Sequence, residues 1–196
     1  MSEVYLETIK VFDGEIFNIS YHQKRYESVL NSLDCSEFEN IKEYLKPPVF
    51  GLYRCRLTYT TNKINVTYHE YKKRKITTLK LVYDDDIDYS QKSASRDDLE
   101  RLFKQRENCD DILIIKNSLI SDTSIANIAF YNSGLWYTPK KPLLNGTTRQ
   151  RLLDEGEIIE KDIRIHDLKN YSKVALMNAM IDFDIITKYD LKDIIC

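Results

Sequence analysis

The chain has 196 residues, of which 42% are hydrophobic and 31% are charged, and its formal net charge at pH 7 is −2. This is the composition of a soluble globular protein that can bury a sizeable core, either as one large domain or as two small ones. A net charge this small gives no bulk attraction to nucleic acid or to a membrane surface, so we expect neither as a partner.

The first half of the chain predicts a small α+β unit. Asp13-Gly14 lies between two apolar segments and predicts a hairpin. The apolar spacing of YHQKRYESVLNSL predicts a helix that ends near Asp34, and a second helix is expected within residues 36–45, ended by Pro47-Pro48. Three further strands are predicted, in GLYRCRLTYT, INVTYHEYK and TTLKLVY.

The second half begins after the acidic stretch DDDIDYSQ, which can link the two halves, and the predicted boundary lies near residues 84–90. The pattern then predicts a helix in RDDLERLFKQR, a buried strand in DDILIIKN and a hairpin around Ser133-Gly134. A helix over 145–155, a short strand within 157–165 and a buried strand in VALMNAMI follow. Because helices and strands mix without a regular βαβ order, we predict an α+β fold in two domains, residues 1–86 and 87–196.

The four cysteines are Cys35, Cys55, Cys109 and Cys196, and they form neither a CxxC pair nor a metal-ligand spacing. We interpret them as reduced thiols of a cytoplasmic protein and expect no metal site. The start of the chain lacks a basic segment followed by an apolar one, so no signal peptide is expected. No apolar run approaches the roughly 20 residues that a membrane span needs.

The segment KKPLLNGTTRQRLL contains the first candidate site. Asn145, Thr147 and Thr148 are residue types that cap helices, and Gly146 permits an unusual backbone angle. The first N–H groups of a helix are unpaired and partly positive, so a phosphate can bind there. An ordinary capped helix after a turn is the alternative interpretation.

Arginines supply two more candidate anion sites. Arg25 follows His22 by three residues on one helical face, where it can bind a phosphate or belong to a solvated basic face. Arg54 and Arg56 share one face of a predicted strand, where they can bind carboxylates or simply face solvent.

Lys92 and Asp122 are candidates for acid–base chemistry. A lysine that acts as a nucleophile must lose its proton, and Arg96, four residues after Lys92, is a cation that would favour this loss. Asp122 ends a buried strand, where an isolated acid is most often a turn or capping residue.

Taken in order, the motifs resemble one known family. The chain reads ETI-K-V-x-DG-x-x-F-x-x-x-x-H-x-x-R, then K-x-x-x-R, D-x-x-x-x-N-I-x-F, TP-x-x-PLL-x-GT-x-R and NAM. This order resembles the class IV pyridoxal-phosphate enzymes, which include branched-chain and D-amino-acid aminotransferases and 4-amino-4-deoxychorismate lyase. The resemblance extends from Tyr5 to about Phe183, and the chain resembles a short form without the family's usual N-terminal segment.

The resemblance implies a two-domain fold like that of D-amino-acid aminotransferase, with pyridoxal 5′-phosphate in a cleft between the domains, and a homodimer. It implies that Lys92 is the Schiff-base lysine and that Asp122 replaces the usual glutamate beside the pyridine nitrogen. The positions that it implies for the cofactor phosphate and the turn beside it are Arg25, Thr147, Thr148, Asn178 and Ala179.

Three functions remain open. The first is a lyase that cleaves 4-amino-4-deoxychorismate to 4-aminobenzoate and pyruvate in folate synthesis, because NAMID resembles the lyase form of the last motif. In that case Arg54 and Arg56 are expected to bind the substrate's carboxylates. The second is an aminotransferase of a small amino acid that uses the same Lys92. The third is a degenerate protein that keeps the fold and has no turnover.

Overall fold

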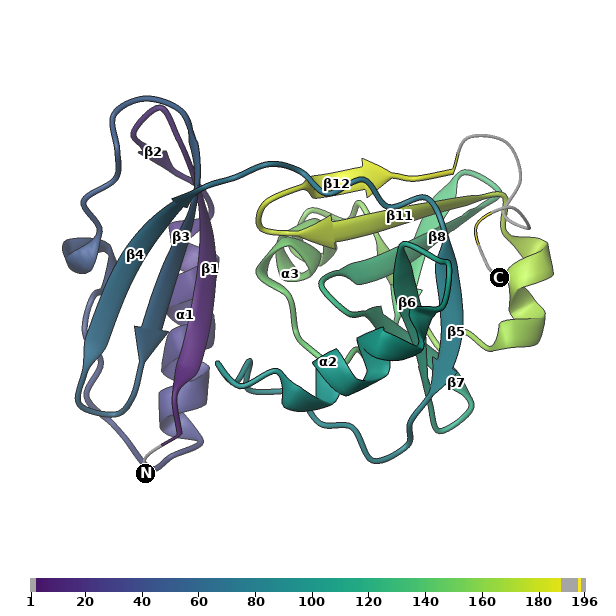
Figure 1. The fold of residues 1–196 in the computed structure, drawn as a ribbon, viewed down its shortest axis with the longest axis horizontal. Helices are drawn as coiled ribbons and strands as arrows, with labels where there is room; N and C mark the ends of the chain where they lie inside the picture. The colour runs from purple at the N-terminus through teal and green to yellow at the C-terminus, as the bar shows by residue number, and fades with distance from the viewer. Residues whose placement is uncertain (1–2, 188–193, 195–196) are drawn as a thin grey trace. The chain divides into compact units, whose positions relative to one another are not determined.

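The computed structural model describes residues 3–187 and 194, and the chain forms two compact units (Figure 1). Unit 1 consists of Met1–Lys73 and Gln91–Ser95. Unit 2 consists of Arg74–Ser90 and Arg96–Cys196. Among the described residues, no helix is both long and apolar enough to cross a membrane.

Unit 1 is an antiparallel sheet with one helix along it. The strand order is β2-β1-β3-β4, and the helix α1 spans Ile19–Asn31 on one face (Figure 1). A single 3₁₀ turn, η1, covers Ile41–Tyr44. The strands are β1 Tyr5–Phe12, β2 Glu15–Ile16, β3 Leu52–Tyr59 and β4 Ile64–Glu70.

The predicted hairpin at Asp13-Gly14 is confirmed. Both residues have positive φ angles, 47° and 81°, and Phe12 pairs with Glu15 across the turn. This is the type I′ geometry that matches the twist of two antiparallel strands. The predicted second helix within 36–45 is present only as η1, where Asn40 caps the turn by accepting a hydrogen bond from the Lys42 N–H at 3.2 Å.

The core of unit 1 lies between α1 and one face of the sheet. Tyr26, Val29 and Leu30 face inward from α1 at helical spacing. Side chains of β1 and β3 alternate between the two faces, as strand geometry requires. The buried apolar side chains on the α1 side of these strands are Tyr5, Ile9, Val11, Cys55, Leu57 and Tyr59.

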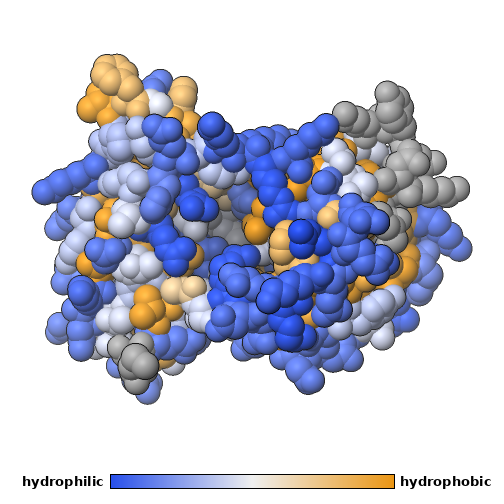
Figure 2. All heavy atoms as spheres, viewed as in Figure 1, coloured by the Kyte–Doolittle hydropathy of each residue, from blue (hydrophilic) through white to orange (hydrophobic). Residues whose placement is uncertain are grey.

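One end of unit 1 exposes apolar side chains. Phe12, Val49 and Phe50 are 47%, 68% and 81% exposed, and an apolar patch is visible over the β2 end of this unit (Figure 2). The Asp13 carboxylate accepts a hydrogen bond from the Gly51 N–H at 2.7 Å, so the loop that carries Val49 and Phe50 is fixed to the hairpin turn.

Unit 2 contains two sheets. The three-stranded sheet has the order β5-β6-β7, and the five-stranded sheet has the order β10-β9-β8-β11-β12. The strands are β5 Leu79–Tyr83, β6 Asp111–Lys116, β7 Leu119–Thr123, β8 Asn127–Asn132, β9 Leu135–Pro139, β10 Ile159–Lys161, β11 Lys173–Asn178 and β12 Asp182–Ile185. The helices are α2 Asp97–Phe103, η2 Lys104–Arg106, α3 Thr147–Asp154 and η3 Ile165–Asn170.

Most pairs in unit 2 are antiparallel, but β5 pairs with β6 and β9 with β10 in parallel. The predicted hairpin at Ser133-Gly134 is confirmed, with φ angles of 49° and 90°. The helix predicted over 145–155 is α3, and VALMNAMI contributes β11, which ends at Asn178. The α+β class predicted from the mixed order of elements is therefore confirmed.

The division between the units differs from the predicted boundary at residue 86. β5 belongs to unit 2, because it pairs with β6 along its whole length. Residues 91–95 belong to unit 1, because they run along the edge of β1. The Leu6 N–H donates to the Lys92 oxygen at 3.1 Å, and the Ala94 N–H donates to the Val4 oxygen at 2.7 Å. Lys92 is therefore part of unit 1, not of the C-terminal domain in which the sequence analysis placed it.

Candidate active site

In unit 2, Asp122 and Asn127 hold the loop that leads into α3. One oxygen of the Asp122 carboxylate accepts from the Asn127 amide at 2.8 Å, and the other accepts from the Leu144 N–H at 3.0 Å. The same Asn127 amide nitrogen donates to the Leu144 oxygen at 2.8 Å. The D-x-x-x-x-N motif thus binds both backbone groups of Leu144, which lies three residues before the start of α3.

Gly146 is the N-cap of α3, and its backbone is ordinary, with φ −66° and ψ 141°. An added Cβ would lie 1.9 Å from the Asn127 side-chain oxygen, so the site requires glycine because Asn127 approaches so closely. The expectation that Gly146 provides an unusual backbone angle is wrong. The N-cap position of α3 is held by Gly146, which has no side chain, and not by Asn145, Thr147 or Thr148.

The first turn of α3 carries an unpaired buried hydroxyl. Thr148 is 1% exposed, and its Oγ1 has no hydrogen-bond partner among the described residues. A buried hydroxyl without a partner costs roughly 1–3 kcal/mol. Thr147 beside it is also buried. This hydroxyl lies where the helix dipole favours negative charge, so the turn has the donors and the polarity that an anionic group needs.

Arg149 serves a different purpose from the two threonines. Its guanidinium is buried and donates to the Pro139 oxygen at 2.9 Å and to the Glu160 carboxylate at 2.6 Å. Arg149 therefore ties α3 to the neighbouring strands β9 and β10.

The end of β11 lies beside the Asp122 loop. The Asn178 side-chain oxygen accepts from the Met180 and Ile181 N–H groups at 2.9 and 3.1 Å, and its amide donates to the Ile125 oxygen at 3.1 Å. Ala179 is half-buried within this turn. Unit 2 thus brings together the residues that were predicted separately at 122, 147–148 and 178–179.

Burial raises the pKa of the Asp122 carboxyl to about 6, although the Asn127 amide and the Leu144 N–H oppose the shift. A raised pKa means that the folded protein binds the proton more tightly than the unfolded chain does. The resulting stabilisation is complete below the unfolded pKa near 3.8 and is lost as the pH rises through about 6.

We therefore compare the free energies of unfolding of the cofactor-free wild type and the Asp122→Asn variant. The wild-type value minus the variant value should fall by about 3 kcal/mol between pH 3.5 and pH 7. Urea denaturation at several pH values measures this difference. Asp154→Asn, at an exposed position of α3, is the control. A difference that stays constant with pH would contradict the prediction.

In unit 1, Lys92 lies at the edge of the sheet. Its backbone φ is 54°, a left-handed value that is uncommon for a residue with a long side chain. The pairing of residues 92–94 with β1 holds this backbone in place. Arg96 belongs to unit 2, where it donates to the Ser124 oxygen at 2.7 Å.

A buried cluster of Glu7, His22 and Arg25 lies on the α1 side of the same sheet. One Glu7 oxygen accepts from Arg25 Nε at 2.7 Å, and the other lies 2.5 Å from Arg25 Nη2 and 2.6 Å from His22 Nδ1. Glu7 and His22 are fully buried, and the Arg25 side chain is 11% exposed.

Burial alone would raise the pKa of Glu7, but the charge of Arg25 and the hydrogen bonds from His22 and Arg25 lower it to about 2. Glu7 was not predicted as a site residue. The available signal was its position: Glu7 lies between Tyr5 and Ile9 on the face of β1 that is otherwise apolar.

Arg54 and Arg56 lie on the other face of the sheet. In the strand register Arg54 is opposite Lys10 and His69, and Arg56 is opposite Thr8 and Thr67. The expected alternation of β3 is confirmed, because Cys55 and Leu57, which alternate with the two arginines, face the core. Arg25 and the Arg54–Arg56 pair are thus on opposite faces, and residues 92–94 run along the edge that separates them.

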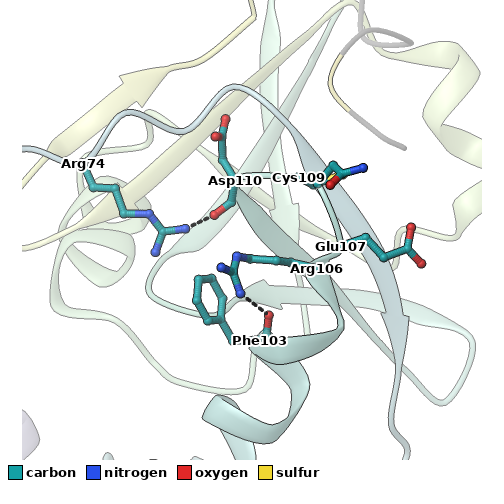
Figure 3. A pocket seen from close by; sticks show the side chains of 7 residues that line it. Arg74, Phe103, Arg106, Glu107, Cys109 and Asp110 are labelled. Carbon is teal, nitrogen blue, oxygen red and sulfur yellow. Dashed lines mark hydrogen bonds between the residues drawn. The ribbon is translucent and has the colours of Figure 1, made fainter.

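A shallow depression of unit 2 shares no residue with these groups (Figure 3). The guanidinium carbons of Arg74 and Arg106 lie 4.9 and 4.2 Å from the ring centre of Phe103. Arg74 also donates to the Asp110 oxygen, and Arg106 donates to the Phe103 oxygen at 3.3 Å. Both arginines are therefore engaged within the wall of this depression.

The described residues contain no group of three or more His, Cys, Asp or Glu side chains that could hold a metal ion. Cys35, Cys55 and Cys109 form no disulfide within the described part of the chain, and Cys196 lies outside it.

The family model for class IV amino-transferases matches residues 5–189 of the chain. The chain belongs to the class IV aminotransferase family. This match spans both units and includes every motif of the site.

Relatives of this family member include a candidate 4-amino-4-deoxychorismate lyase from Haemophilus somnus. Its crystal structure has a TM-score of 0.84 and 38% sequence identity, over 92% of this chain and 97% of that one. A candidate aminodeoxychorismate lyase of Schizosaccharomyces pombe is 26% identical, over 91% of this chain and 87% of that protein.

An aminotransferase of Brucella abortus, crystallised with the cofactor pyridoxal phosphate, has a TM-score of 0.74. The match covers 97% of this chain and 84% of that one, at 14% identity. At this identity the likeness establishes the fold alone, and it agrees with the class IV fold expected from the motifs.

Proposed function

We propose that this class IV protein is a pyridoxal-phosphate-dependent lyase that converts 4-amino-4-deoxychorismate to 4-aminobenzoate and pyruvate in folate synthesis. The observation that carries the proposal is the 38% identity, over nearly all of both chains, to the Haemophilus somnus protein. The NAMID form of the last motif supports the same choice.

The residues of the site fit the proposed cofactor. The unpaired Thr148 hydroxyl and the start of α3 suit a phosphate dianion. The Asp122 carboxylate can keep the ring nitrogen of the cofactor protonated by accepting a hydrogen bond from it. Each carboxylate oxygen can accept this bond in addition to the one from Asn127 or Leu144. Arg25 is proposed as a second phosphate ligand, and Asn178 and Ala179 as the turn beside it.

Lys92 is the proposed attachment point and the proposed proton carrier. When bound, the cofactor withdraws electrons from the carbon that bears the substrate's amino group. The Lys92 amine can then take the proton from that carbon. Loss of this proton lets the C–O bond between the ring and the enolpyruvyl group break, and the ring becomes aromatic. The departing enolpyruvate takes a proton back from Lys92 and becomes pyruvate. Arg54 and Arg56 are proposed to bind the substrate's carboxylates.

The second candidate is an aminotransferase of a small amino acid, and the name of the family favours it. One assay separates the two candidates: purified protein is given aminodeoxychorismate, and 4-aminobenzoate is measured. Its formation supports the lyase, whereas transfer of amino groups to a keto acid without 4-aminobenzoate supports the aminotransferase. Wild-type protein that stays colourless with excess cofactor would exclude both and support the degenerate protein.

We also propose that the protein is a cytoplasmic homodimer. Light scattering measures the mass that tests the dimer.

Replacing Thr147 and Thr148 together with valine is expected to weaken cofactor binding about tenfold, because the phosphate loses two hydroxyl donors. The cofactor-free protein should stay folded and should gain about 1–3 kcal/mol of stability, since the Thr148 hydroxyl has no partner to lose and its burial is unfavourable. Fluorescence titration and thermal denaturation measure the two effects. Unchanged cofactor affinity would count against the phosphate assignment.

A further inference from the structure

The contact between Glu7 and Arg25 restricts how Arg25 can meet an anion. The carboxylate occupies the Nε and Nη2 edge of the guanidinium with both of its oxygens. A guanidinium is planar and its donors are fixed in that plane. Glu7 therefore sets both the plane and the direction of the Arg25 guanidinium.

His22 fixes Glu7 in turn. Its Nδ1 donates to a carboxylate that stays ionised because of Arg25, so Nδ1 carries the proton. Burial lowers the pKa of His22, and the charges of Arg25 and Lys92 lower it further, against the effect of Glu7. The imidazole is therefore neutral, and the negative charge of Glu7 is balanced by Arg25 alone.

Lys92 and Arg25 belong to the same surroundings. Both of their charges act on the His22 ring, and the Lys92 oxygen is bound by Leu6, the neighbour of Glu7. The cluster thus connects the proposed attachment lysine and the proposed phosphate arginine within unit 1.

We propose that Glu7 is a positioning residue that orients Arg25 toward the phosphate of the cofactor, and that His22 holds Glu7 in place. This inference rests on the proposed function, in which Arg25 contacts that phosphate. Neither Glu7 nor His22 contacts the cofactor in this account.

The test compares two probes, pyridoxal phosphate and pyridoxal, which differ only in the phosphate. Glu7→Gln removes the charge that orients Arg25. We expect its affinity for pyridoxal phosphate to fall about tenfold and its affinity for pyridoxal to change less than about twofold. Adding Glu7→Gln to Arg25→Met should change neither affinity further, because Glu7 acts through Arg25. Glu15→Gln, at an exposed position, is the control.

A second pair of variants covers the case in which Glu7→Gln does not fold. The quantity compared is the affinity for pyridoxal phosphate divided by the affinity for pyridoxal. His22→Gln keeps a donor for Glu7, so its ratio should stay within about threefold of the wild-type ratio. His22→Leu has no such donor, and its ratio should fall by more than about threefold. A folded Glu7→Gln or His22→Leu that weakens both probes equally, or neither, would overturn the inference. Wild-type protein that binds neither probe would instead refute the proposed function.

Discussion

Lys92→Ala is expected to abolish the visible absorption of the cofactor-loaded protein and to reduce turnover by at least about 10³-fold. Without the amine there is no covalent attachment point and no group to move the substrate's proton, and removing such a group typically costs several powers of ten. Absorption spectra and the 4-aminobenzoate assay measure the two losses.

Two further variants show whether the loss is specific to this amine. Lys92→Arg keeps a positive charge at the sheet edge but provides no nucleophile, so it should be as inactive as Lys92→Ala. Lys140→Ala, at an exposed position of unit 2, should keep full absorption and turnover. A coloured and active Lys92→Ala protein would show that another lysine is the attachment point.

Gly146→Ala is expected to destabilise the protein by about 2–4 kcal/mol, which is more than an ordinary glycine substitution costs. The new methyl would lie 1.9 Å from the Asn127 oxygen. The amide of Asn127 is held by Asp122 and Leu144, so it cannot move without breaking buried hydrogen bonds. Chemical denaturation measures the loss, and the cofactor affinity should fall with it because the start of α3 shifts.

The double variant Gly146→Ala/Asn127→Ala identifies the cause. Removing the Asn127 side chain removes the clash, so the two substitutions together should cost clearly less than the sum of their separate effects. Gly134→Ala is the comparison for backbone strain alone, since its φ is 90° and no atom lies within 4 Å of the added Cβ. Additive effects would show that the close approach of Asn127 is not the source of the loss.

The sequence was most informative where the local rule and the fold agree. Asp13-Gly14 and Ser133-Gly134 both predict two-residue turns, and both have positive φ angles at the predicted positions. The alternation of Arg54 and Arg56 with buried residues was equally readable, because strand periodicity depends on the backbone alone. The helix predicted within 36–45 is reduced to η1, since only Ile41 and Leu45 of these residues are buried and packing stabilises a helix more than its apolar spacing does.

The sequence nominates members of the proposed site, but it does not reveal the contacts that these residues make. The order of motifs led to Lys92, Asp122 and the Thr147–Thr148 pair. It gave no sign that Asp122 clamps Leu144 or that Glu7 holds Arg25, because both contacts join residues far apart in the sequence. Gly146 is an example, since the reason for a glycine at this position is the close approach of Asn127, which is distant in the sequence.

The return of residues 91–95 to the edge of β1 has a consequence for protein synthesis. The N-terminal strand emerges from the ribosome first, yet its edge partner follows more than 80 residues later. Until then β1 has an open edge of the kind that invites pairing with other chains. A fragment that stops at Lys73 would keep this exposed edge permanently, so the first unit cannot be produced intact as a simple N-terminal piece.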